Sequence, residues 1–438
     1  MTRNRFSNYI SWLFFPARFL FPEIAARQDS KSDQSPTVID VPGWECLELK
    51  TDPNELAAFN RQVGDTYLGG SGNAFLVPLF GRQSAFTLDG QDHRLARKLI
   101  SQAISKPCVD RVMAHMPHFL ALELAAAPLH SRLQVGRVMR RVTLRAMCLT
   151  ILGSTDEALF TNLLRRLESA TGFFANIVSY NRAFWYPRGR WSVGAEVARR
   201  KRRIDDIILQ VIADRREQLQ PHGGKAPYRH DLLGHLLSEQ SAHGYSDQFI
   251  RDNLVSTLAA GYDTTAAAMT WMLYWLSKDD RSRQLLHRHF RTGSQEYEPF
   301  AEAFVSEAMR YCPPLEILPR RPVASSGATD PSSSNQATLV CPCPHQVHHS
   351  RQVYGDPEAF RPERFIDNKY SPTEYFPFGL GNRLCLGVIL APKMLKATLD
   401  WVIAQERFPQ FDKKKFLPIR RNVSLWPSIY NKATITKI

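Results

Sequence analysis

The stretch Phe376–Gly387 constrains this chain more than any other part of the sequence. Glycines at 379, 381 and 387 allow tight backbone geometry and the close approach of a flat ligand. Cys385 stands just before an apolar helical pattern, so its sulfur is expected at a helix N-terminus, where the helix dipole favours the thiolate over the thiol. Arg383 adds a positive charge two residues away. The stretch therefore predicts a loop built around one reactive sulfur.

That sulfur suits haem iron better than other metals. A single thiolate without a nearby Cys or His partner is a poor zinc or iron–sulfur site, but it is a good axial haem ligand. The stretch resembles the haem-binding loop of the cytochrome P-450 superfamily, F-x-x-G-x-R-x-C-x-G, with every defined position occupied by Phe378, Gly381, Arg383, Cys385 and Gly387. The alternatives are an inert buried cysteine in a glycine-rich turn and a nucleophilic cysteine.

The resemblance implies that Arg383 binds a haem propionate, and three further residues are candidates for the same role. His93 and Arg97 are four residues apart after Asp89-Gly90, so they share one face of an expected helix as two cationic donors. The resemblance implies that an H-x-x-x-R pair at this place contacts a propionate. Arg320, after Pro319, matches a strand arginine with the same role in many members of the superfamily.

The longest predicted helix begins at Ser246, an expected N-cap, and continues to about Ser277. Inside it, residues 260–265 read Ala-Gly-Tyr-Asp-Thr-Thr. Thr264 can donate to a carbonyl one turn earlier and bend the helix locally. This stretch resembles the superfamily's A-G-x-D/E-T-T/S motif, which implies that Thr264 is the hydroxyl beside bound oxygen and that Asp263 is the acid of a proton relay.

A structural network is predicted near the cysteine loop. Glu307 and Arg310 are three residues apart and can pair on one helix face, although such a pair alone says little. Pro362-Glu363-Arg364-Phe365 follows. Together these residues resemble the superfamily's E-x-x-R and P-E-R-F elements, with Arg364 as the third member, and the network is expected to hold the loop before Cys385.

The resemblance implies a mainly α fold with small β-sheets (α+β), in which haem lies between the long central helix and the cysteine loop. We expect one large catalytic domain over residues 41–438, preceded by an arm over residues 1–40. The arm holds an aromatic-rich stretch, residues 9–24, which is too short to span a membrane and is interrupted by prolines. This stretch is expected either to pack on the core or to contact a membrane surface peripherally.

The net charge of +14 is compatible with nucleic acid, an anionic membrane or an acidic protein as a partner. No nucleic-acid-binding signature is present, so we expect a separate electron donor, a ferredoxin or a flavodoxin-like protein with its reductase. Seven scattered cysteines do not form a disulfide framework and favour a reducing compartment, the cytoplasm. No flavin- or nicotinamide-binding segment is recognised, and a monomer is expected.

Between Val323 and Ser350 the sequence departs from the superfamily's pattern, so an altered sheet is expected there. Cys341 and Cys343, with His345 close by, could suggest a metal site, but no second pair at useful spacing completes one, apart from His348 and His349. We interpret these residues as structural. The resemblance implies that residues of about 160–205 form lid helices over the substrate channel. The aromatic residues of this region could line that channel or belong to the core: Phe173, Phe174, Tyr180, Phe184 and Trp185.

The prediction is a haem-thiolate monooxygenase that uses haem b and O2 to insert one oxygen atom into an apolar small molecule, such as a fatty acid or terpenoid-like compound. Three alternatives stay open. They are a peroxide-using enzyme, another haem-thiolate enzyme that does not hydroxylate, and a catalytically silent haem-binding protein. Neither the substrate nor the position of oxidation follows from one sequence.

Overall fold

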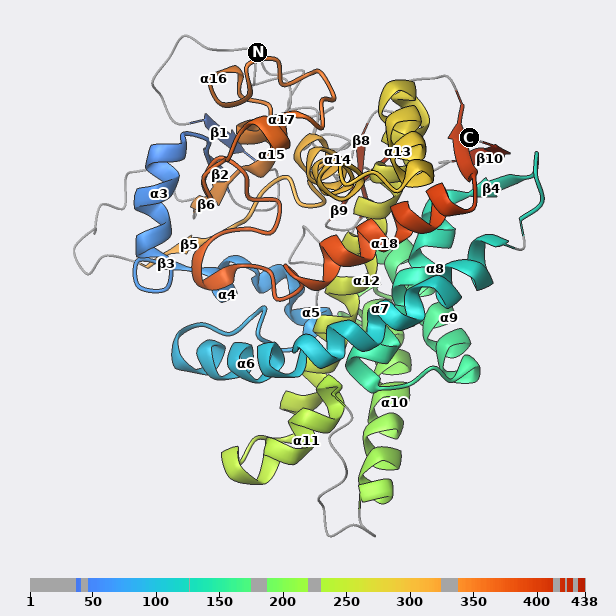
Figure 1. The fold of residues 1–438 in the computed structure, drawn as a ribbon. Coiled ribbons are helices and arrows are strands. Elements are labelled where there is room, and N and C mark those ends of the chain that lie inside the picture. The colour runs from blue at the N-terminus through green and yellow to red at the C-terminus, as the bar shows by residue number, and fades with distance from the viewer. Residues whose placement is uncertain are drawn as a thin grey trace.

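The structure is a computed structural model, which describes residues 37–40, 46–125, 127–174, 187–219, 230–323, 338–412, 418–421, 424–427 and 432–437. Helices dominate this part of the chain (Figure 1). They are α3 (Pro53–Gln62), α4 (Gly69–Gly72), α5 (Val77–Phe80), α6 (Gly90–Ala103), α7 (Lys106–Leu120), α8 (Val135–Met147), α9 (Glu157–Phe174), α10 (Val193–Leu219), α11 (Leu232–His243), α12 (Asp247–Lys278), α13 (Asp280–Thr292), α14 (Tyr297–Tyr311), α15 (Pro344–His348), α16 (Arg351–Tyr354), α17 (Arg364–Asp367) and α18 (Leu390–Ala404).

The strands form four small sheets. One has the order β1 (Thr37–Asp40), β2 (Cys46–Lys50), β6 (Thr338–Pro342), and another has the order β4 (Arg132–Gln134), β10 (Lys432–Lys437), β7 (Arg407–Phe411). Two-stranded sheets pair β3 (Tyr67–Leu68) with β5 (Arg321–Pro322), and β8 (Pro418–Arg421) with β9 (Ser424–Pro427). The predicted mainly α fold with small sheets is therefore confirmed.

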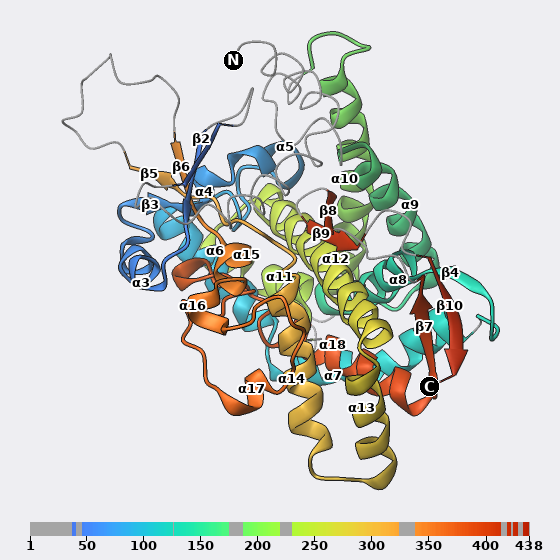
Figure 2. The ribbon, with the colours of Figure 1, turned by 90° about the horizontal axis from the view of Figure 1, so that it is seen from above.

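Helix α12 runs through the middle of the molecule in both ribbon views (Figures 1 and 2). It has 32 residues, which corresponds to about 48 Å. Its predicted start is confirmed, because the Ser246 hydroxyl accepts from the backbone N–H of Phe249 at 3.2 Å. Most of its residues are buried on all sides, as expected for a helix that other helices surround.

Gly261 explains how closely α8 approaches the middle of α12. A Cβ at this position would lie 2.3 Å from the Sδ of Met147, the last residue of α8. The hydroxyl of Thr143, also on α8, donates to the carbonyl of Tyr262 at 3.0 Å. The glycine costs helix propensity, about 1 kcal/mol relative to alanine, but it permits this contact.

The sheet near residue 340 is built from β2 and β6, which pair in parallel, with Cys46 opposite Thr338 and Lys50 opposite Pro342. Residues 324–337, the core of the atypical segment, lie outside the described residues. Cys341 and Cys343 are buried in a small apolar cluster, and burial raises the pKa of the Cys343 thiol to about 12. Among the described residues, no group of three or more His, Cys, Asp or Glu side chains is arranged to hold a metal ion.

The N-terminal arm is described only from residue 37, so the aromatic stretch over residues 9–24 lies outside the described part of the chain. Residues 37–40 form β1, which pairs antiparallel with β2. No helix in the described ranges is both long and apolar enough to cross a bilayer.

Candidate functional site

The cysteine loop is shaped by its glycines and by contacts to α3. Gly379 and Gly381 have positive φ angles of 81° and 63°, a conformation that favours glycine. A Cβ on Gly381 would also lie 2.2 Å from the Oδ1 of Asn60 on α3. The side chain of Asn382 donates to the carbonyl of Val63, just after α3, at 3.0 Å. These contacts anchor the turn that precedes Cys385.

Two backbone hydrogen bonds position Cys385. Its N–H donates to the carbonyl of Phe378 at 2.9 Å, and its Sγ accepts from the N–H of Gly387 at 3.3 Å. The helix expected directly after the cysteine begins only at Leu390. The sulfur therefore accepts a hydrogen bond from one specific N–H group. The prediction that it lies at a helix N-terminus is wrong.

The electrostatics of this sulfur also differ from expectation. Surrounding protein atoms desolvate the Cys385 thiol and raise its pKa, although the residue is exposed to the open cavity, and the N–H of Gly387 and the charge of Arg97 oppose that rise. Arg383 was expected to supply the nearby charge. Its guanidinium instead donates to the carbonyls of Ala85 and Leu88, at 3.0 and 2.6 Å. Arg97 is therefore the cation that favours the Cys385 thiolate.

Arg383 is held in place by Asp89, a residue whose role the sequence analysis missed. The Asp89 carboxylate accepts from Arg383 at 2.6 Å, and also from the backbone N–H groups of Gly70 and Ser71, each at 2.8 Å. It is the N-cap residue of α6, but its side chain makes no capping hydrogen bond to that helix.

The predicted propionate ligands meet in one cavity. His93, Arg97, Arg320 and Arg383 all line it, although they come from α6, the segment before β5 and the cysteine loop. Burial and the charge of Arg383 lower the pKa of Arg320 to about 10. The buried Nε of Arg320 has no hydrogen-bond partner among the described residues. The cluster therefore offers N–H donors to an anionic group.

His93 differs in charge from its prediction as a cationic donor. It is buried on α6, and burial, together with the charges of Arg383 and Arg97, lowers its pKa to about 4. At neutral pH its imidazole is uncharged and can donate one N–H. The pair that shares this helix face is thus one neutral donor and one cation.

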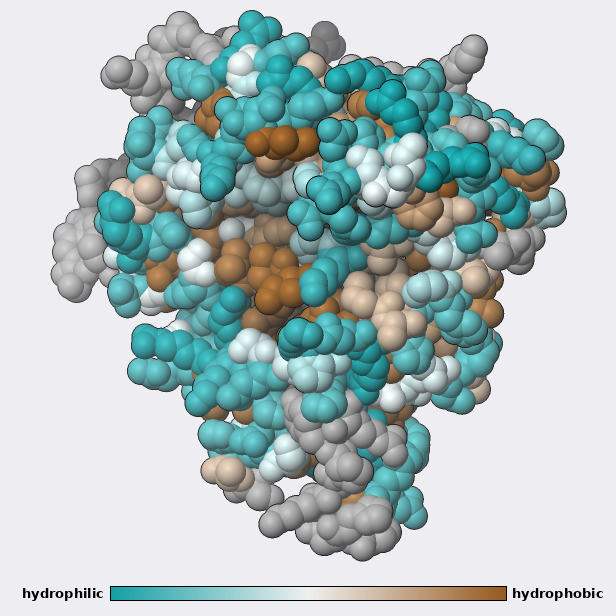
Figure 3. Space-filling model, in the orientation of Figure 1, coloured by the Kyte–Doolittle hydropathy of each residue, from teal (hydrophilic) through white to brown (hydrophobic). Residues whose placement is uncertain are grey.

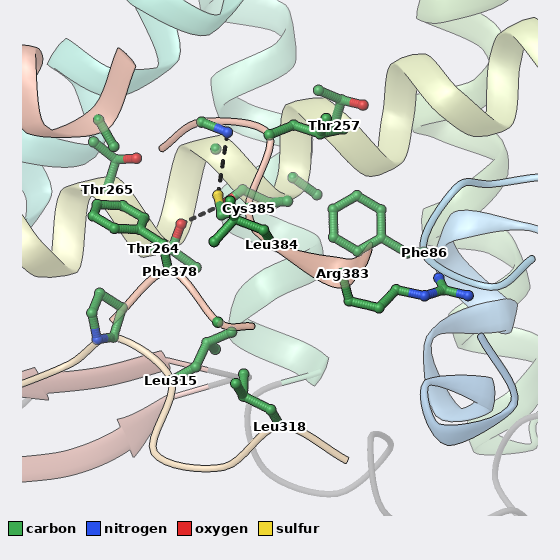
Figure 4. A pocket seen from close by; sticks show the side chains of 18 of the residues that line it. Phe86, Thr257, Thr264, Thr265, Leu315, Leu318, Phe378, Arg383, Leu384 and Cys385 are labelled. Atoms are coloured by element: carbon green, nitrogen blue, oxygen red, sulfur yellow. Dashed lines mark hydrogen bonds between the residues drawn. The ribbon is translucent and has the colours of Figure 1, made fainter. Parts of the chain in front are cut away.

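The opposite wall of the cavity comes from the middle of α12. Thr264 and Thr265 line the cavity, and the hydroxyl of Thr264 donates to the carbonyl of Ala260 at 2.6 Å, as predicted. Asp263 is buried and is not among the lining residues. Figure 4 shows Thr264 and Cys385 in the same cavity, and Arg383 extending away from the sulfur toward the blue part of the chain.

The cavity measures about 320 Å³, and its lining is mostly apolar. In Figure 3, brown side chains gather in a hollow near the centre of the molecular face, in the region between α6 and the loop that leads into α18. Among the described residues, no Asp or Glu lines the cavity. Its formal charges are therefore all positive. Phe173 and Phe174 close α9, but their side chains, and Tyr180, Phe184 and Trp185 entirely, lie outside what is described.

The predicted Glu307–Arg310–Arg364 network is fully buried next to this site. Arg310 donates twice to the Glu307 carboxylate, at 2.7 and 2.9 Å, and Arg364 donates to it at 3.1 Å. The remaining N–H groups of the two guanidiniums donate to backbone carbonyls, including that of His348. The imidazole of His348 in turn accepts from the N–H of Phe376 at 3.0 Å. His348, which the sequence analysis interpreted only as structural, thus links the network to the start of the cysteine loop.

Comparisons with known proteins point to one family. The family model described as Cytochrome P450 matches residues 70–428. Cytochrome P450 135B1 of Mycobacterium tuberculosis is 26% identical over 83% of this chain and 77% of that protein. Cytochrome P450 138 of Mycobacterium bovis is 28% identical over 75% of this chain and 73% of that protein. The solved structure titled "Retinoic acid bound cyanobacterial CYP120A1" has a TM-score of 0.79 and 18% identity, covers 98% of this chain and 97% of its own, and shares the fold.

Proposed function

Since this chain belongs to the cytochrome P450 family, we propose that it is a monooxygenase that inserts one oxygen atom of O2 into an apolar small molecule, with a fatty acid or terpenoid-like compound as substrate. Members of the family bind haem b through a cysteine thiolate and act as oxidoreductases. The substrate, the redox partner and the roles of individual residues in this chain are proposed.

The described residues fit haem b. The Sγ of Cys385 lies in the cavity wall, and the middle of α12 forms another part of that wall. The buried Nε of Arg320 and the donors on His93, Arg97 and Arg383 suit two propionate groups. When bound there, haem supplies the oxygen-activating and electron-transfer chemistry. The protein supplies the thiolate, the donors for the carboxylates and a cavity with few polar groups.

In this proposal, Thr264 and Asp263 control protons. The Thr264 hydroxyl can exchange its bond to the Ala260 carbonyl for a bond to a ligand or a water in the cavity. Asp263, the neighbouring buried acid, is proposed to supply the proton through such a chain. A peroxide-using enzyme has less need of such a relay, so an acid at position 263 beside a threonine at position 264 supports the proposal of an O2-using enzyme.

The observation that carries the substrate class is the apolar lining of the cavity around Cys385 and Thr264. The structural neighbour's title names bound retinoic acid, which is itself a terpenoid carboxylic acid. This supports testing both substrate classes. Electrons are proposed to come from a separate ferredoxin or flavodoxin-like donor with its reductase.

The test is a visible-absorption titration of the purified ferric protein with a long-chain fatty acid and with retinoic acid. A low- to high-spin shift of the haem band is expected, because the ligand displaces water from the iron. Turnover follows with a surrogate ferredoxin system and NADPH, in parallel with hydrogen peroxide alone. Product with peroxide but none with NADPH would favour the peroxide-using alternative. Iron reduction without product from any bound ligand would favour a silent haem protein.

Thr264→Ala tests the relay separately. Its hydroxyl makes the same bond to a preceding carbonyl as that of Thr270, which donates to Ala266 at 2.7 Å but does not line the cavity. Thr264→Ala should lower the ratio of product formed to NADPH consumed by up to about 100-fold, the lower end of the contribution of a positioned proton-transfer group. Thr270→Ala should leave the ratio unchanged. Equal ratios of product to NADPH in both variants would show that Thr264 is not part of the proton relay.

A further inference from the structure

Four oxidisable side chains on α12 and α14 contact one another in turn, and we call them the aromatic row: Trp271, Tyr274, Trp275 and Tyr311. The ring centroids of successive members are 5.4, 5.5 and 4.6 Å apart, and each pair meets edge to face. Figure 2 shows α14 beside the C-terminal half of α12, where the row crosses from one helix to the other. Because indoles and phenols lose an electron more readily than phenylalanine rings do, the row is a candidate path for electrons.

The inner end of the row lies next to the cavity. On α12 the lining residues recur along one helix face and end with Ala268. Trp271 is three residues further along the same face, so it lies one helical turn beyond the cavity wall, and it is 2% exposed. Its indole N–H donates to the carbonyl of Leu425 at 3.1 Å, which fixes the ring. Haem bound beside Thr264 would therefore have an oxidisable indole close to it on α12.

The outer end of the row has a proton acceptor. Tyr311 is the last residue of α14, and its phenol donates to the Oε2 of Glu358 at 3.3 Å. Burial, together with the charge of Glu358, raises the pKa of Tyr311, so the phenol stays protonated at neutral pH. A protonated phenol that loses an electron must also lose its proton. Glu358 is exposed, so it can accept that proton and release it to solvent.

The indole of Trp275, in the middle of the row, has no such outlet. Its buried N–H has no hydrogen-bond partner among the described residues. An oxidised indole that cannot release its N–H proton remains a cation, which is a stronger oxidant than the neutral radical. On its other side the ring stacks on Phe360, which is not readily oxidised, with centroids 4.4 Å apart. An electron vacancy at Trp275 would therefore be filled from Tyr311, where the proton can leave.

We propose that the aromatic row conducts oxidising equivalents from the haem site to the protein surface when a peroxide is consumed without substrate. Tyr311 loses one electron, which passes through Trp275 and Trp271 to the haem, and the phenol proton passes to Glu358. The ring of Tyr274 contacts both indoles and bridges them without itself being oxidised. This inference requires bound haem but no substrate, so it goes beyond the proposed function.

The electrons and protons balance with a thiol as the reductant. Each Tyr311 radical takes one hydrogen atom from a thiol in solution, which restores the phenol. Cleavage of one peroxide O–O bond consumes two electrons, so two passages along the row complete it. Overall, one hydrogen peroxide and two thiols give two waters and one disulfide. The chain would thereby protect its haem site from peroxide that no substrate uses.

The test mixes the haem-loaded full chain with hydrogen peroxide in the absence of substrate and thiol, and records electron paramagnetic resonance after freeze-quenching. A tyrosyl radical is expected, and Tyr311→Phe should lose it while keeping the ring beside Trp275. Tyr274→Phe should keep the signal, because a phenylalanine ring still bridges the indoles. A matched control is Tyr354→Phe, which removes another buried phenol, one that donates to the carbonyl of Glu374 outside the row. It should also keep the signal.

Two further measurements examine the route and its effect. Glu358→Gln still accepts a hydrogen bond but takes up no proton, so an indole radical signal should replace the tyrosyl signal. With a thiol present, Tyr311→Phe should lose its haem absorption band faster than the unaltered protein during exposure to peroxide. An unaltered tyrosyl signal in Glu358→Gln, or equal loss of the haem band in Tyr311→Phe and the unaltered protein, would overturn the route.

Failure of the inference is distinguishable from failure of the proposed function. If the tyrosyl signal persists in Tyr311→Phe, or if the unaltered protein consumes peroxide without forming the signal, the aromatic row does not conduct. Product formation from a substrate under these circumstances leaves the proposed function standing. A Tyr311 radical in a protein that oxidises no substrate would instead support the inference and overturn the proposed function.

Discussion

Two groups of buried charge lie within this molecule, and they differ in how they are balanced. In the Glu307–Arg310–Arg364 network, every arginine is matched by a carboxylate or by backbone carbonyls. In the cavity, four arginines and one histidine face a space that no Asp or Glu of the described residues lines. The first group is complete within the chain. In the second, Arg383 and Arg420 pair with Asp89 and Glu316, whereas Arg97 and Arg320 have no ion pair among the described residues. Local charge balance therefore separates a structural network from a binding site.

The largest effect is expected for Glu307→Ala. It removes the carboxylate that both arginines share and leaves two buried positive charges, so it should lower the free energy of unfolding by about 3–5 kcal/mol. Denaturant unfolding of the variant measures this. The exposed pair Lys106–Asp110 provides the control, since Asp110→Ala should cost about 1 kcal/mol or less. Similar losses in both variants would refute the contrast between a buried network and a surface pair.

Removing a cation from the cavity should weaken haem binding more than it lowers the stability of the protein. Arg97→Ala removes a partly buried charge that also favours the Cys385 thiolate, so haem should be lost about tenfold or more faster. The apoprotein should be destabilised little, because no carboxylate of the chain loses its partner. Haem transfer to an acceptor globin measures the rate. Arg94→Ala, which removes an exposed arginine from the same helix, should leave it unchanged. A large loss of apoprotein stability in Arg97→Ala would place this residue with the structural group.

The smallest effect concerns pH. The folded-state pKa of His93, about 4, is below its ordinary value of 6.5, so the unfolded chain binds a proton more readily than the folded one. The contribution of His93 to stability is full above pH 6.5 and is lost as the pH falls toward 4. When the pH falls from 7 to 5, the His93→Gln apoprotein should lose about 1 kcal/mol less of its free energy of unfolding than the unaltered apoprotein. This value is smaller than the full effect of the pKa shift, because solvent screening reduces that effect. Unfolding at pH 7 and pH 5 tests this. Identical pH dependence in both proteins would mean that His93 titrates normally.

The local features of this protein could be predicted from its sequence. The start of α12 at Ser246, the bond from Thr264 to Ala260 and the Glu307–Arg310 pair all depend on residues three or four apart, and helix geometry fixes such neighbours. The family resemblance added Arg364 and the set of residues around the cavity. Contacts across long sequence separations, such as that of Asp89 with Arg383, had no comparable signal.

The sequence by itself determined the family, the mainly α fold, the haem ligand candidate and the spacing of its motifs. Only the tertiary structure decided the charge of His93, the choice of Arg97 over Arg383 as the cation that acts on Cys385, and the presence of Arg420 in the cavity wall. The physical reason is that side-chain type and spacing are local properties. Desolvation and charge pairing depend on which distant segments are buried together, and the chain reveals that only when it is folded.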